Sequence, residues 1–151
     1  MSRIDFYHLQ KQTLDEVLPK LLLKAYATGK KIKLAVGTPE RVDFINSLLW
    51  TFDDESFLPH GTKKDGFAEM QPIYVSSDDE NPNNAEFLFL TDGAVVEGEK
   101  LAAFERVFNI FDGNSEDSLV SAREYWKQLK DSGAELHYWQ QDSSGKWEQK
   151  V

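Results

Sequence analysis

The chain has 151 residues, of which 40% are hydrophobic and 13% aromatic, a composition that predicts one globular domain over residues 1–151 and argues against disorder. Acidic residues number 26 against 17 basic ones, so the net charge of −9 disfavours direct binding to nucleic-acid phosphates. The sequence has no cysteine, no signal-peptide core and no apolar run near the ~18 residues that a bilayer span needs. We therefore expect a cytoplasmic protein without disulfides and without a membrane partner.

The first half of the chain alternates strand and helix patterns. An alternating aromatic segment over residues 4–9 predicts a strand, and the capping-box pattern of residues 13–16 then begins a helix that Gly29 ends. A second strand over residues 31–36 is followed by a helix with Thr38 as N-cap and a proline at its first position. Strands and helices in this order favour a parallel α/β core.

The second half is predicted to add further strands to the same sheet. These strands cover residues 72–75, 86–91, 106–111 and 135–142, and residues 56–60 are expected to be extended. Residues 61–66 and 76–85 are predicted as loops, and residues 99–104 as a short helix. The apolar segment 86–91 is typical of a strand covered on both faces. Ser115 is the expected N-cap of the last helix.

Motifs for catalysis are weak throughout the sequence. The loop over residues 37–41 follows a predicted strand, but it lacks the second glycine and the Lys-Ser/Thr pair of a phosphate-binding loop. The three histidines lack metal-ligand spacing, and the acidic runs 53–55 and 78–80 lack the spacing of a calcium loop. No serine lies in a nucleophile elbow. We therefore expect no enzyme activity, no metal and no cofactor.

The last predicted helix carries a cationic stripe beside its apolar side. Arg123, Lys127 and Lys130 are spaced i, i+4 and i+7 and share one face. The apolar side consists of Leu119, Ala122, Trp126 and Leu129. The stripe is either a solvated flank paired with Glu124 and Asp131, or a slot for an acidic peptide with a hydrophobic end. In the second case the cations hold carboxylates and the aromatic wall receives the apolar tip.

A second candidate surface lies at the end of the helix that begins after Thr38. Trp50 follows two leucines of the inner helix face and points about 100° away from them. Phe52 and Phe57 come shortly after it. These aromatics either cover the edge of the sheet as an extension of the core or form an exposed hydrophobic anchor for a partner.

Six blocks of the sequence, in this order and spacing, together resemble the chi subunit of bacterial DNA polymerase III. They cover residues 6–9, 29–32, 49–50, 56–60, 122–127 and 133–136, and so span nearly the whole chain. The resemblance implies a three-layer α/β/α sandwich with a mostly parallel central sheet, Rossmann/P-loop-like but without a phosphate-binding loop. It also implies a non-catalytic accessory subunit of the polymerase holoenzyme, which the psi subunit tethers to the clamp loader.

The resemblance further implies binding to the acidic C-terminal tail of single-stranded-DNA-binding protein, which ends in proline-phenylalanine. That contact associates the subunit indirectly with single-stranded DNA. The family's tail-binding positions fall on Arg123, Trp126, Lys127 and Lys130. Lysine where relatives have arginine loses bidentate contacts to carboxylates, so a lower affinity is expected.

The psi-facing aromatics of the family fall on Trp50 and Phe57. The sequence leaves open whether psi or a helicase is the partner, and it assigns residues 138–139 no role beyond strand packing. Two other interpretations remain: a small α/β nucleotide- or small-molecule-binding protein, and a direct binder of single-stranded DNA, against which the net charge argues.

Overall fold

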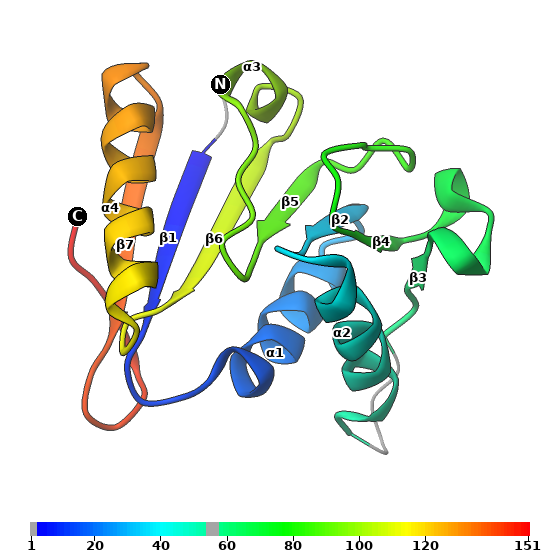
Figure 1. Cartoon of the computed structure of the whole chain (residues 1–151), viewed down its shortest axis with the longest axis horizontal. Coiled ribbons are helices and arrows are strands. Elements are labelled where there is room, and N and C mark those ends of the chain that lie inside the picture. Colours follow the sequence, from blue (N-terminus) through cyan, green and yellow to red (C-terminus); the bar gives the residue numbers. More distant parts are fainter. Residues whose placement is uncertain (1–2, 54–57) are drawn as a thin grey trace.

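The computed structural model describes residues 3–53 and 58–151 and is built around one sheet of eight strands (Figure 1). The strands are β1 (Arg3–Leu9), β2 (Ile32–Ala35), β3 (Gly61–Thr62), β4 (Ile73–Ser76), β5 (Phe87–Leu90), β6 (Arg106–Asp112), β7 (Glu135–Gln141) and β8 (Trp147–Gln149). Their order is β3-β4-β2-β5-β6-β1-β7-β8, and each neighbouring pair is parallel except β7 with β8. The predicted parallel core is therefore confirmed.

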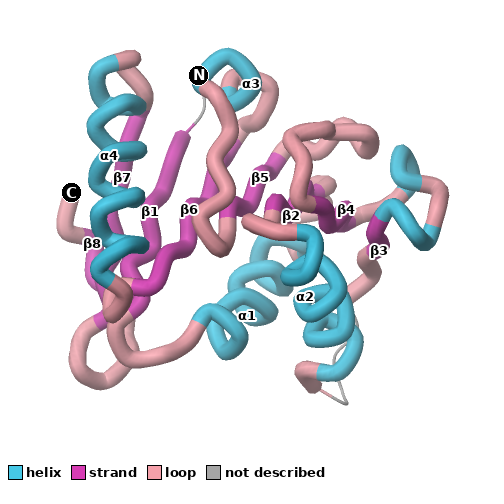
Figure 2. Tube along the Cα trace, viewed as in Figure 1, coloured by secondary structure: helices cyan, strands magenta, loops and turns pink. Residues whose placement is uncertain are grey.

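Helices cover both faces of this sheet. They are α1 (Leu14–Tyr26), α2 (Pro39–Thr51), α3 (Gly98–Leu101) and α4 (Glu116–Asp131). The first two pack on one face, where Leu18 and Ile45 join a buried cluster with Phe108. The last two pack on the other face, where Leu129 lies in a second cluster with Phe6. This division gives the expected α/β/α sandwich, and Figure 2 shows α4 lying over β7 at one end of the sheet.

Helices α1, α2 and α4 begin where the sequence predicts, because the N-cap side chain of each accepts a hydrogen bond from a free backbone amide. Thr13 Oγ1 accepts from the amide of Glu16, whose carboxylate accepts from the amide of Thr13. Thr38 and Ser115 cap α2 and α4 in the same way. Local sequence therefore sets the start of the helix that carries the cationic stripe.

Predicted strand ends shift by one residue, and three further elements differ from the prediction. Helix α1 ends at its C-cap Ala27, and Gly29 lies two residues later with a φ of 84°. Helix α3 begins at Gly98 and ends at Leu101, earlier than the predicted 99–104. Residues 61–66 are a short strand and a 3-10 turn (Lys63–Asp65) instead of a loop, because the Asp65 carboxylate accepts from the amide and hydroxyl of Thr62. Residues 56 and 57 of the predicted extended segment lie outside the described residues.

The antiparallel strand β8 is an element that the sequence pattern did not predict. It pairs with the end of β7 and adds an outer strand to the sheet beside α4.

Among the residues that the structure describes, no helix combines the length and apolarity that crossing a membrane requires.

Candidate functional site

A pocket of about 440 Å³ lies between α4, the end of β6, the middle of β7 and the segment after β8. Its lining is largely apolar: Phe111, Leu119, Ala122, Trp126, Tyr138 and Val151. Two cationic residues, Arg123 and Lys150, complete it. An apolar floor with cations beside it suits a ligand that combines an apolar group with negative charge.

Trp126 forms a fixed wall of this pocket. Its ring meets Phe6 edge-on at a centroid distance of 5.1 Å and Tyr138 edge-on at 5.7 Å. The side chain is half-buried, so one part belongs to the core while another lines the pocket. Packing holds the ring before any ligand arrives, which reduces the entropy that binding must overcome.

The cationic stripe runs along α4 away from the pocket. Arg123 lines the pocket, whereas the exposed Lys127 and Lys130 lie further along the helix. Lys130 comes seven positions after Arg123, which corresponds to about 10 Å along the helix axis. Within residues 3–53 and 58–151, none of the three forms an ion pair, so the pairing with Glu124 and Asp131 that one of the two alternatives required is not formed. The stripe remains available to external carboxylates.

Tyr138, which lines the pocket, contacts the buried His8 of β1. The Tyr138 hydroxyl lies 2.6 Å from Nδ1 of His8. Burial lowers the pKa of His8, Arg123 lowers it further, and Asp112 opposes both. Burial also raises the pKa of Tyr138. A Cβ at Gly113 would stand 2.0 Å from the His8 ring, so the chain passes close to it. The Tyr138 hydroxyl is therefore held by a short, partly buried contact with the His8 ring.

The second predicted surface is described only in part. Trp50 is 49% exposed at the end of α2, and its ring lies 4.2 Å from that of His60. Phe52 is partly buried against the α1–α2 cluster, which agrees with an extension of the core. Phe57 lies outside the described residues. The exposed face of Trp50 fits the anchor interpretation.

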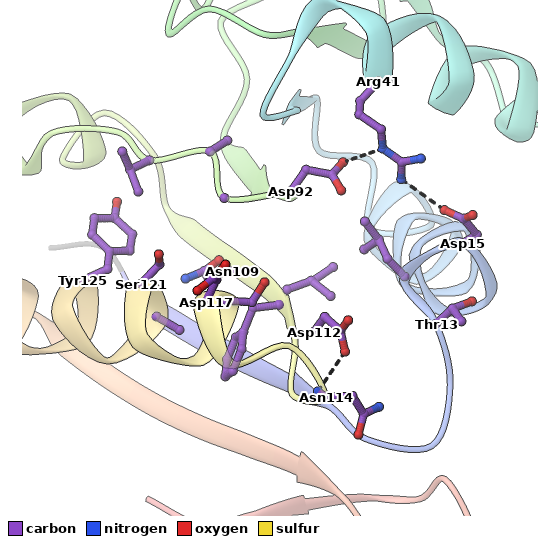
Figure 3. Close-up of a pocket in the computed structure, with 18 of the residues that line it drawn as sticks. Thr13, Asp15, Arg41, Asp92, Asn109, Asp112, Asn114, Asp117, Ser121 and Tyr125 are labelled. Carbon is purple, nitrogen blue, oxygen red and sulfur yellow. Dashed lines mark hydrogen bonds and ion pairs between the residues drawn. The ribbon is translucent and has the colours of Figure 1, made fainter.

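A larger crevice of about 490 Å³ lies on the other side of α4, at the carboxyl ends of the parallel strands (Figure 3). The loop after β1 leads to α1 on one face, while the loop after β6 leads to α4 on the opposite face. Open α/β sheets bind ligands at such switch points. Arg41 bridges Asp15 and Asp92 here, at 3.3 and 3.2 Å.

The polarity of this crevice disfavours phosphate. Lys11 and Arg41 are its cations, against four aspartates, Asp15, Asp92, Asp112 and Asp117. A Cβ at Gly37 would stand 2.0 Å from the backbone oxygen of Asp92, so this glycine permits close packing of two loops. Among the described residues, no group of three or more histidine, aspartate or glutamate side chains is placed to hold a metal ion.

The fold and the groove together define an open α/β protein with a cationic, aromatic groove beside its last helix. The model of the family described as "DNA polymerase III chi subunit, HolC" matches residues 1–137. The chain is also 30% identical over 117 residues to the "Probable DNA polymerase III subunit chi" of Rickettsia prowazekii (strain Madrid E), covering 74% of this chain and 71% of that protein. The chain belongs to the DNA polymerase III chi subunit family. Membership links it to DNA replication and to the polymerase assembly as an accessory subunit.

Sequence reasoning found only one wall of the groove. The family match ends at residue 137, whereas Tyr138, Lys150 and Val151 also line the pocket. Phe111 was assigned to a buried strand and not to a site. The alternation of strand β7 was the available signal, because it places Tyr138 on one face and Trp139 on the other.

Proposed function

We propose that the chain is a non-catalytic accessory subunit that binds the acidic C-terminal tail of single-stranded-DNA-binding protein. A second contact, to the psi subunit, links it to the clamp loader. The two contacts together connect the loader to coated single-stranded DNA. The observation that carries the proposal is an apolar pocket with cations beside it, on a protein whose net charge is −9. A cationic site on an acidic protein selects particular partners instead of attracting anions in general.

The arrangement of the groove sets the direction of the bound tail. The apolar end enters the pocket against Trp126, and Arg123 receives a carboxylate beside it. Preceding acidic residues then extend along α4 toward Lys127 and Lys130, over about 10 Å. The proposal rests on this order of one apolar pocket followed by a line of cations.

The test is a titration with a fluorescent synthetic acidic peptide that ends in proline-phenylalanine. Lys127→Ala should weaken binding about fivefold, because a charge-assisted hydrogen bond is lost. Lys24→Ala on α1 is the matched control, since it removes an equally exposed lysine far from the groove. Binding should also weaken as salt rises. A wild-type protein that does not bind the peptide at low salt disproves the proposed function.

For the psi contact, the proposed anchor is Trp50 with Phe57. A Trp50→Ala variant should recover less psi than wild type in a pull-down, because exposed tryptophans often dominate the energy of an interface. Phe44→Ala is a suitable control: Phe44 is 47% exposed on the same helix, and six residues before Trp50 places it on a different face. Equal recovery with Trp50→Ala and wild type would reject this surface.

A second candidate function is the binding of a small polar molecule at the switch-point crevice. It is favoured by Asn109, which lines the crevice, is only 8% exposed and has no side-chain hydrogen bond within the described part of the chain. Thermal-shift measurements with nucleotides and divalent metals test it, and a shift of several degrees with one compound would support it. Direct binding of single-stranded DNA is tested separately by titrating DNA without the partner protein.

A further inference from the structure

The segment after β8 builds the second wall of the groove, beyond the region that the family match covers. Lys150 and Val151 line the same pocket as Arg123. The Lys150 amide donates to the Tyr138 carbonyl at 2.7 Å, and the Tyr138 amide to the Val151 carbonyl at 3.4 Å. These bonds extend the β7–β8 pairing past its last ladder residue. Because side chains alternate along strands, Lys150 shares a face with its neighbour Tyr138, which faces α4.

The hairpin that presents Lys150 is well ordered by its own turn. The Asp142 carboxylate accepts from the amide of Ser144 at 2.8 Å and from the amide of Lys146 at 3.0 Å. Gly145 has a φ of 88°, which a residue with a side chain rarely adopts. On the far face, Trp147 meets Tyr7 edge-on at 5.2 Å. The turn and the tryptophan fix the second strand against the sheet.

A buried glutamine ties the same hairpin to the loop after β1. Oε1 of Gln141 accepts from three consecutive amides, those of Gln10, Lys11 and Gln12, at 3.1, 3.1 and 3.2 Å. Its Nε2 donates to the side chain of Gln12 at 2.9 Å. Since Gln141 is only 2% exposed, these bonds are protected from water. Lys150 is therefore carried by a rigid element, and little ordering is needed for it to engage a ligand.

Lys150 is also easily released to a ligand. Its Nζ lies 2.9 Å from a carboxylate oxygen of Glu148, two residues earlier on the same strand face. The two side chains are 48% and 49% exposed. A pair this exposed is held weakly in water, so an incoming carboxylate can replace Glu148. Glu148 thus acts as an internal competitor for the cation.

We propose that Lys150 is a further binding residue of the groove and that, with Arg123, it holds the terminal carboxylate of a bound acidic peptide. This inference rests on the proposed function of the groove. Arg123 and Lys150 are the two cations that line the apolar pocket, whereas Lys127 and Lys130 lie outside its lining. A peptide whose apolar end fills the pocket therefore brings its terminal carboxylate to these two residues. The acidic side chains that precede the apolar end of the peptide then contact Lys127 and Lys130.

The test measures the anisotropy of the same labelled peptide with four proteins: wild type, Lys150→Ala, Lys146→Ala and Glu148→Gln. Lys150→Ala should weaken binding about fivefold. Lys146 is an exposed lysine in the turn of the same hairpin, outside the pocket lining, so its variant carries the same net charge and should bind within about twofold of wild type. Glu148→Gln should bind more tightly than wild type, because it frees Lys150.

The outcomes separate the inference from the proposed function. Equal affinities for Lys150→Ala and Lys146→Ala, with wild type binding normally, would overturn the inference and leave the proposed function standing. A wild-type protein that does not bind overturns both. A peptide amidated at its C-terminus then tests the assigned contact: the loss caused by Lys150→Ala should shrink to less than about twofold. A loss of unchanged size would show that Lys150 does not hold the terminal carboxylate.

Discussion

The two sides of helix α4 offer different chemistry. On one side, an apolar pocket has Arg123 and Lys150 beside it. On the other, the switch-point crevice has more aspartates than cations, and its Arg41 is already bound between Asp15 and Asp92. The position that open α/β folds generally use for ligands is here the one less suited to anions. Position in the fold therefore does not by itself predict where an anion binds, and local charge and apolarity have to be considered as well.

Charge reversal on either side of the helix gives the largest expected contrast. Arg123→Glu should weaken binding of the acidic peptide roughly thirtyfold, because an attraction next to the pocket becomes a repulsion. Lys11→Glu, which makes the same charge change in the crevice, should leave the affinity within about twofold of wild type. Isothermal titration calorimetry of both variants measures the contrast. Equal losses would mean that the peptide responds only to net charge.

The buried amide of the crevice gives the next largest effect. Asn109→Leu should leave the free energy of unfolding within about 1 kcal/mol of wild type, since Asn109 has no side-chain hydrogen bond within the described residues and its amide faces the open crevice. Urea unfolding followed by fluorescence measures this change, with Ser121→Ala on the facing helix as a control for crevice polarity. A larger destabilisation by Asn109→Leu would indicate that Asn109 contacts a bound ligand or water, and would favour small-molecule binding at the crevice.

A smaller effect is expected from the histidine under the groove. The pKa of His8 is lower in the folded protein than its ordinary value, chiefly because of burial. The unfolded chain therefore takes up the proton more readily, so stability is fully present above about pH 6.5 and declines as the pH falls through the folded pKa. Thermal unfolding of wild type and His8→Gln between pH 7.5 and about 5 should show the steeper decline in wild type. His137→Gln, on the neighbouring strand, is the control. Parallel profiles for wild type and His8→Gln would contradict this role for His8.

Much of the fold was predictable because its signals are local. The N-caps Thr13, Thr38 and Ser115 act within three residues of the helix starts they define. The same locality explains why α4 and its cationic stripe were correctly placed. The short strand β3 and the outer strand β8 were missed, since each depends on pairing with another strand more than on its own residue pattern.

By itself, the sequence determined one wall of the groove: an amphipathic helix with Arg123, Lys127 and Lys130 beside Trp126. Helical spacing is a property of neighbouring residues, so it can be found without a fold. The pocket itself depends on the tertiary structure, which brings Phe111 and Tyr138 under the helix and places Lys150 and Arg123 in the same lining. These residues come from separate strands, and only the pairing of β6, β1, β7 and β8 in one sheet makes them neighbours.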